Sequence, residues 1–345
     1  MIHVRNVTKD FHTVQRVSGV RGALRSLIAP HRVVKQAVSD ASFTVPEGQL
    51  VSLLGPNGAG KSTLIKMLTG IVVPTSGEVT VAGLVPHKNR ERNAYRIGAV
   101  FGQRTQLWWD LPAKQSFAVL RDIYGIDPGA YSARLREFDD LLNLSQFWDT
   151  RVRHLSLGQR VRCDLAAALL HDPPVVFLDE PTIGMDAVVK EQVREFVRAQ
   201  VQERGRTVLL TTHDMGEVER LSSRVLVINR GRIVLDSTLR EIRADYGGSW
   251  RIRIGLRHPG EEPNLPEGLH VISRAGTDLL VGAGQDALLS PQQAIAVIAK
   301  QVPAESFSIE AADLEEVMRE VYTRAGARPG ASRLPASALQ EGREG

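Results

Sequence analysis

Residues 55–63 limit the folds open to this chain more than any other stretch. Two glycines lie five positions apart, followed by a lysine and two hydroxyl side chains, in the run Gly55, Pro56, Asn57, Gly58, Ala59, Gly60, Lys61, Ser62 and Thr63. Residues 50–54 have the apolar character of a buried strand, and residues 64–68 have that of a helix. Glycines in such a turn let backbone N–H groups approach phosphate oxygens, and the helix start adds a positive dipole. The stretch predicts a nucleotide-binding phosphate loop in an α/β fold.

Two side chains of this loop have the chemistry that a nucleotide site needs. Lys61 can reach the β- and γ-phosphates, and the Ser62 hydroxyl can ligate Mg²⁺. A glycine-rich turn without a ligand is the alternative interpretation. The other motifs of the chain decide between the two.

Composition sets the broad limits. The chain has 345 residues, which suggests two domains, and 43% of them are hydrophobic, as is ordinary for a globular protein. Its single cysteine, Cys163, excludes an internal disulfide. No apolar run approaches the roughly 18 residues that span a bilayer, so we expect any membrane part on another chain. The net charge of +4 comes with arginines scattered along the chain, and no nucleic-acid partner is expected.

Strands alternating with helices predict a mostly parallel sheet. We expect strands at 2–8, 43–45, 50–54, 77–85, 96–101, 175–178, 207–212, 225–229 and 232–235, and helices at 190–204 and 216–222. The domains expected are an α/β unit at 1–240 with a helical insertion at about 104–172, a small α+β accessory or regulatory domain at 249–325 and a disordered tail at 326–345. A basic amphipathic helix is expected at 16–28, packed on its own domain, a membrane or a partner.

Polar residues end several of these strands. Asp179 closes a buried strand and is expected to hold Mg²⁺, while Glu180 could polarise an attacking water. His213 ends another strand, where it could touch a γ-phosphate, and Gln103 ends a third. Taken singly, each could be a polar cap. Because parallel strands end at one edge of their sheet, the four together predict a site.

A further motif, residues 155–159, opens a helix. Its Ser156 lies 23 positions before Asp179. Its sequence Leu-Ser-Leu-Gly-Gln resembles the signature motif of ATP-binding cassette (ABC) ATPases, usually Leu-Ser-Gly-Gly-Gln. With the phosphate loop, the strand-end residues and a D-loop-like stretch at 183–186, the set resembles an ABC transporter ATPase subunit over about residues 1–240. Residues 101–112 and 155–160 look like the bacterial antibiotic- and multidrug-efflux exporter class.

The resemblance implies more than the residues alone. It implies a cassette fold with a mostly parallel core sheet and an antiparallel β subdomain, ATP and Mg²⁺ as ligands, and a head-to-tail homodimer or heterodimer. It also implies a separate transmembrane permease and a cytoplasmic, peripheral position on the inner face of the membrane. By the same resemblance, Phe11 would stack on adenine and Asp186 would lie at the dimer interface. Gln103 would join Ser62 and Asp179 at Mg²⁺, while the partner's nucleotide would contact Ser156, Gly158 and Gln159.

Two features need the structure. Leu157 stands where a signature glycine is usual, which puts the close approach of its backbone to the γ-phosphate in question. Trp108 and Trp109 would lie where a permease docks its coupling helix, or else in the core of the helical insertion. A soluble ABC ATPase acting on ribosomes or DNA is the alternative function. A P-loop kinase or GTPase would lack the signature motif.

Overall fold

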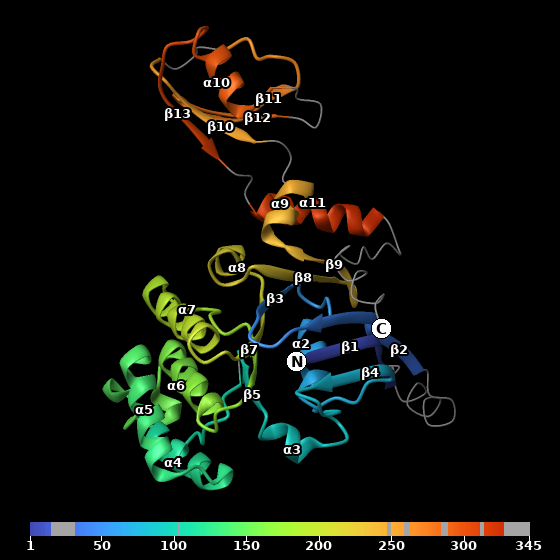
Figure 1. Ribbon diagram of the computed structural model, residues 1–345, viewed down its shortest axis with the longest axis vertical. Coiled ribbons are helices and arrows are strands. Elements are labelled where there is room, and N and C mark those ends of the chain that lie inside the picture. The colour runs from blue at the N-terminus through green and yellow to red at the C-terminus, as the bar shows by residue number, and fades with distance from the viewer. Residues whose placement is uncertain are drawn as a thin grey trace, which may run out of the picture. The chain divides into compact units, whose positions relative to one another are not determined.

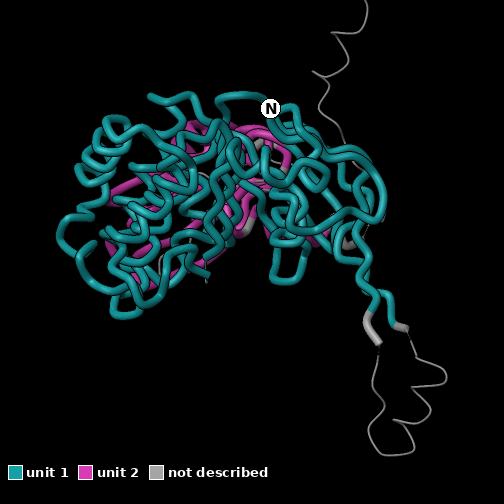
Figure 2. The backbone as a smooth tube through the Cα atoms, turned by 90° about the horizontal axis from the view of Figure 1, so that it is seen from below, with its two compact units in different colours: residues 1–236, 332–345 teal, residues 237–331 magenta. Residues whose placement is uncertain are grey.

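The computed structural model describes residues 1–14, 32–102, 104–246, 250–258, 263–283, 289–310 and 314–327. These residues fall into two compact units that divide between Asp236 and Ser237 (Figure 2). The helix expected at 16–28 and the tail beyond residue 327 lie outside the described residues.

A six-stranded sheet forms the centre of the first unit (Figure 1). Its strand order is β5-β6-β7-β3-β8-β9, and the first five strands pair in parallel. A two-residue turn with positive φ at Arg230 and Gly231 joins β8 to β9, as in tight hairpins. The strands are β3 (Leu50–Leu54), β5 (Ile97–Phe101), β6 (Val175–Asp179), β7 (Thr207–Thr212), β8 (Arg224–Asn229) and β9 (Arg232–Thr238).

Both faces of this sheet are buried, and alternate residues of each strand enter different cores. In β6, Val175 and Phe177 enter one core, while Val176 and Leu178 enter the other. This period-two division explains why the strand is apolar throughout, as expected for a parallel strand covered on both sides. The expected α/β fold with a mostly parallel core sheet is confirmed.

Helices cover one face and a second sheet contributes to the core on the other. On the second side lie α2 (Lys61–Leu68) and an antiparallel sheet ordered β2-β1-β4. Its strands are β1 (Ile2–Val14), β2 (Arg32–Val45) and β4 (Ser76–Val81). The first side carries α4 (Ala113–Tyr124), α5 (Pro128–Leu142), α6 (Leu157–Leu169) and α7 (Ala187–Gln202). Two short α-helices, α3 (Arg90–Ala94) and α8 (Met215–Leu221), also belong to this unit.

Several expected boundaries were wrong. The first hairpin, formed by β1 and β2, is longer than expected. Register shifts between Val4 and Asp10 break the alternation of side chains that would have revealed its length in the sequence. Strand β4 ends at Val81 rather than at residue 85, since Ala82 and Gly83 turn the chain with positive φ. Helix α7 begins at Ala187, three residues earlier than expected, directly after its N-cap.

The second unit has its own core. An antiparallel sheet ordered β11-β12-β10-β13 packs Ile252 and Ile254 against Ala294 and Ile298 of a helix. The elements are α9 (Leu239–Tyr246), β10 (Arg251–Leu256), β11 (Leu269–Ala275), β12 (Asp278–Ala283), α10 (Pro291–Ile298), β13 (Ala304–Glu310) and α11 (Leu314–Ala327). Helix α9, which the sequence reading missed, packs on α11. Among the described residues, no helix has the length and apolar character to cross a bilayer.

Candidate nucleotide-binding site

The phosphate loop leaves β3 and enters α2 through backbone that only glycine adopts easily. Gly58 and Gly60 have φ values of 80° and 111°. A Cβ at Gly60 would lie 2.5 Å from the carbonyl oxygen of Ala37, so the loop also needs glycine for lack of space. Lys61, only 5% exposed, donates from its ammonium group to the Gly55 carbonyl at 2.7 Å. The predicted strand–loop–helix arrangement is therefore present.

The register of the parallel strands brings the predicted polar residues to one edge. Phe101 of β5 pairs with Asp179 of β6, and Asp179 pairs with Thr211 of β7. The Thr211 hydroxyl donates to Asp179 Oδ1 at 2.5 Å, which fixes the direction of the carboxylate. Leu54, the last residue before the phosphate loop, pairs with Thr212 of the same strand β7.

Glu180 lies between the loop lysine and the strand-end histidine. Its Oε1 atom is 3.5 Å from Lys61 Nζ and 3.5 Å from His213 Nδ1. The residue has a φ of 52°, a left-handed conformation that costs a non-glycine residue about 1 kcal/mol or more. Its N–H donates to the Thr211 carbonyl at 3.0 Å, which holds this backbone in place. Three of the predicted catalytic and phosphate-binding residues thus meet.

Two predicted residues are less defined by the structure. Gln103 lies outside the described residues, but Gly102 just before it donates its N–H to the Asp179 carbonyl at 2.8 Å. The first strand was expected to end at residue 8, before Phe11. Instead Phe11 lies within β1, opposite Lys35. The Lys9 ammonium group lies 5.2 Å from the centre of the Phe11 ring, and Phe11 as a residue is 37% exposed.

The signature motif forms the start of α6. Ser156 is the N-cap, and its hydroxyl accepts the Gln159 N–H at 3.2 Å while the Gln159 side chain accepts the Ser156 N–H at 2.9 Å. This capping box holds both side chains at the exposed end of the helix. Because a helix start carries unpaired N–H groups and a positive dipole, it can take up an anion.

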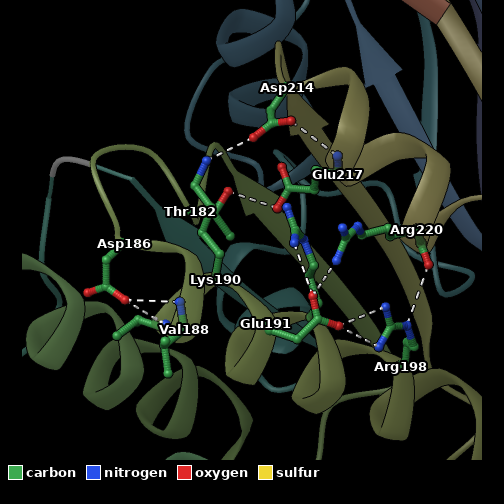
Figure 3. Close-up of polar contacts among 11 residues, drawn as sticks. Thr182, Asp186, Val188, Lys190, Glu191, Arg198, Asp214, Glu217 and Arg220 are labelled. Carbon is green, nitrogen blue, oxygen red and sulfur yellow. Dashed lines mark hydrogen bonds and ion pairs between the residues drawn. The ribbon is translucent and has the colours of Figure 1, made fainter. Parts of the chain in front are cut away.

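The stretch 183–186 lies beside the signature motif. Asp186 caps α7 by accepting the N–H groups of Val188 at 3.1 Å and Val189 at 3.0 Å (Figure 3). A Cβ built on Gly158 would lie 3.2 Å from Cγ1 of Val189, and one on Gly184 would lie 3.0 Å from Cδ2 of Leu157. The Leu157 side chain thus packs towards the D-loop-like stretch and the core behind it.

A polar network ties this stretch to the residues after His213 (Figure 3). Lys190 of α7 pairs with Asp214 at 2.8 Å, and its hydrogen bond lowers the pKa of the Asp214 carboxyl. The Thr182 hydroxyl donates at 2.9 Å to Glu217, which is fully buried, and burial raises the pKa of the Glu217 carboxyl. Asp214 also caps α8, the helix that carries Glu217. The segments after Glu180 and after His213 are therefore joined at two points.

Trp108 and Trp109 are not core residues of the helical insertion. Their exposed fractions are 40% and 49%, so the core interpretation is wrong. The guanidinium group of Arg160, on α6, lies 5.5 Å from the centre of the Trp109 ring. The pair is an apolar surface next to the helix that the signature motif begins.

Comparisons with known proteins agree on one family. A family model described as ABC transporter matches residues 38–183. The chain is 33% identical over 211 residues to the ABC transporter ATP-binding protein NatA of Bacillus subtilis (strain 168), covering 61% of this chain and 85% of that protein. It is 37% identical over 230 residues, 66% and 71% of the two chains, to the daunorubicin resistance ATP-binding protein DrrA3 of Streptomyces coeruleorubidus. The chain belongs to the ABC transporter family.

A solved structure of an ABC cassette supports the same conclusion for the fold. The ATP-binding cassette MJ0796, in a dimeric post-hydrolysis state bound to ADP and Pi, aligns with a TM-score of 0.58 and 25% identity. The alignment covers 70% of this chain and 99% of that one. This chain is accordingly an ATP-binding subunit of an ABC transporter, and it has ATPase activity.

Sequence reasoning missed the residues that hold the ABC motifs in place. Lys190, Thr182 and Glu217 carry no motif of their own, and only the structure brings them to their partners. Asp164 left a signal in the sequence. It lies three residues after Val161 and four before Ala168, so a carboxylate stands on the apolar face of α6.

Proposed function

We propose that this chain hydrolyses ATP within a head-to-tail pair of cassettes and so drives export through a separate transmembrane permease. The observation that carries the proposal is the meeting of Lys61, Glu180 and His213 at the end of the phosphate loop. Lys61 would bind the β- and γ-phosphates. Glu180 would take the proton of the attacking water, and His213 would contact the γ-phosphate.

The remaining ligands of the nucleotide fit this chemistry. The Ser62 hydroxyl and the Asp179 carboxylate are hard oxygen ligands, and the Thr211 hydroxyl already orients Asp179. They would hold Mg²⁺, which neutralises charge on the phosphates when bound; by resemblance Gln103 would join them. The backbone of Gly55–Thr63 would cradle the phosphates, and Phe11 would stack on adenine.

The exposed start of α6 supports the paired arrangement. Ser156 and Gln159 are held by their capping box, and Ser156 is exposed. In a head-to-tail pair this end would contact the nucleotide of the other subunit, with Asp186 at the same interface. Two copies of this chain, or this chain and a second cassette, would complete two sites.

Export is favoured by the names of relatives. The linearmycin resistance ATP-binding protein LnrL of Bacillus subtilis (strain 168) is 34% identical over 64% of this chain and 70% of its own length. With the daunorubicin resistance relative, it supports a role in efflux. We place the chain on the cytoplasmic face of the membrane, with Trp108 and Trp109 against the permease.

Replacing the proposed base tests this function. Glu180→Gln removes the group that takes the proton but keeps the size of the side chain, so ATP should bind and hydrolysis should fall at least a hundredfold. Without hydrolysis, ATP should hold two chains together. We would measure phosphate release, and molar mass by light scattering with and without ATP. Unchanged hydrolysis would contradict the role of Glu180 as the base. A chain that stays monomeric with ATP would contradict the proposed pair of cassettes.

The same variant identifies the partner. Tagged Glu180→Gln protein, purified with ATP from gently solubilised membranes of its own host, should bring down a polytopic membrane protein in equal amount. Recovery from the soluble fraction with ribosomes or DNA would instead support the alternative function.

A further inference from the structure

Asp164 is a buried carboxylate outside the nucleotide site. It lies on α6, two turns after the signature residue Ser156, and only 4% of its surface is exposed. A carboxylate in such a place is costly unless hydrogen-bond donors satisfy it. The residues that supply those donors therefore identify the segment that Asp164 holds in place.

Among the described residues, the hydrogen-bond donors to the Asp164 carboxylate come from the segment that follows Gln103. Its Oδ1 atom accepts the Thr105 hydroxyl at 2.8 Å and the Gln106 N–H at 3.1 Å. The Gln106 side chain in turn donates to the Asp164 carbonyl at 3.0 Å. The Thr105 hydroxyl also accepts the Leu107 N–H at 3.1 Å, so the bound segment has a fixed shape.

The attachment continues along the chain towards the start of α6. Besides the contact of Arg160 with Trp109, the Arg153 guanidinium pairs with Asp110 at 2.7 Å, and the Arg153 N–H donates to the Trp109 carbonyl at 3.1 Å. Exposed ion pairs contribute little, whereas hydrogen bonds to a buried carboxylate contribute more. The Asp164 contacts are therefore the main attachment.

We propose that Asp164 is a positioning residue that joins residues 105–110 to the signature helix, so that both move as one body. Because the two segments move together, a force on the segment beside Gln103, or on Trp108 and Trp109, displaces Ser156 as well. The inference rests on the proposed pairing of two cassettes. With the attachment broken, α6 would be correctly placed for a smaller fraction of the time, and the apparent affinity of the pair would fall by that fraction.

Matched substitutions in the full-length Glu180→Gln protein test this role. Thr105→Val removes the hydroxyl at nearly constant shape, and Thr105→Ser keeps it. Asp164→Ala removes the acceptor, and Asp164→Asn keeps an acceptor oxygen. We would measure the dissociation constant of the ATP-bound pair by light scattering and the ATP affinity of the dilute monomer with a fluorescent ATP analogue. Thermal unfolding of each variant checks the fold.

We expect Thr105→Val and Asp164→Ala to weaken the pair about tenfold, as the loss of a buried hydrogen bond implies. The monomer should keep its ATP affinity within about twofold, and Thr105→Ser and Asp164→Asn should resemble the parent. If Asp164→Ala fails to fold, the two Thr105 variants decide. If Thr105→Val and Thr105→Ser pair with the same dissociation constant, the inference is overturned and the proposed function stands. The same holds if a variant's monomer loses as much ATP affinity as its pair loses stability. A parent that stays monomeric with ATP would overturn the proposed function and this inference with it.

Discussion

Leu157 illustrates how a residue that departs from a motif can pack against the chain's own neighbouring loop. The position usually carries glycine in ABC signatures, so a leucine there puts the close approach of the backbone to the γ-phosphate in question. In the structure, Leu157 packs against Gly184, on the chain's own D-loop-like stretch. The side chain is thus accommodated by a second glycine, whose φ is 73°.

Substitution of Gly184 tests this accommodation. Gly184→Ala should lower the free energy of unfolding by about 1 kcal/mol for its positive φ, and by a further amount for the crowding of Leu157. Gly125→Ala is the matched control, since Gly125 has a φ of 61° and nothing within 4 Å of a built Cβ. We would measure urea unfolding of both variants, with and without Leu157→Ala. Equal losses for the two glycines in the Leu157 background would contradict the packing.

The pKa of Asp164 predicts a pH dependence of stability. Burial raises the pKa of this carboxyl from 3.8 to about 6. The folded chain therefore holds the proton more tightly than the unfolded chain, so the stabilisation is complete below pH 3.8 and is lost as the pH rises through about 6. The stability of the parent relative to Asp164→Asn should fall between pH 4 and 6, by at most about 1.4 kcal/mol per pH unit. Urea unfolding across that range measures it, and a constant difference would contradict the burial effect.

At the scale of elements, the loop between β5 and α4 connects the site to the surface. It begins beside Asp179, through Gly102, and continues to the exposed pair Trp108 and Trp109. Trp108→Ala with Trp109→Ala should preserve the fold and ATP hydrolysis by the isolated chain but abolish transport with its permease. Transport assays in reconstituted vesicles measure this, with the exposed Val271→Ala of the second unit as control. Unfolding of the double variant would contradict a surface role.

The sequence predicted those elements whose pattern is local. The apolar run of β6 and the glycines of the phosphate loop determine their structure by themselves, and the site residues at strand ends followed from parallel pairing. Helix α9 and the length of the first hairpin were missed. The helix is mostly polar, with Ile242 the fully buried residue among its described side chains, and the hairpin has bulges that disturb its alternation. The contacts of Lys190 and Asp164 join segments distant in sequence, so no local pattern reveals them.

At the scale of the whole molecule, the two units have separate cores. The residues buried around the central sheet lie before residue 237, and those of the second core lie between Trp250 and Phe307. We expect a chain ending at Thr238 to fold and to bind ATP with an affinity within about threefold of the full chain. Circular dichroism and binding of a fluorescent ATP analogue measure this. Aggregation of the shorter chain would show that the second unit is needed for folding.

The division of β6 between two cores has a consequence for how such a chain can diverge. Its four apolar residues can exchange for others of similar size with modest effect, because each core accepts many combinations. Deleting one residue is different. If the residues before the deletion keep their pairing, every side chain after it would change faces, and Asp179 would shift by about 3.3 Å relative to its neighbours. Over generations the apolar residues of this strand can therefore be substituted, while the number of residues between Pro174 and Glu180 cannot change.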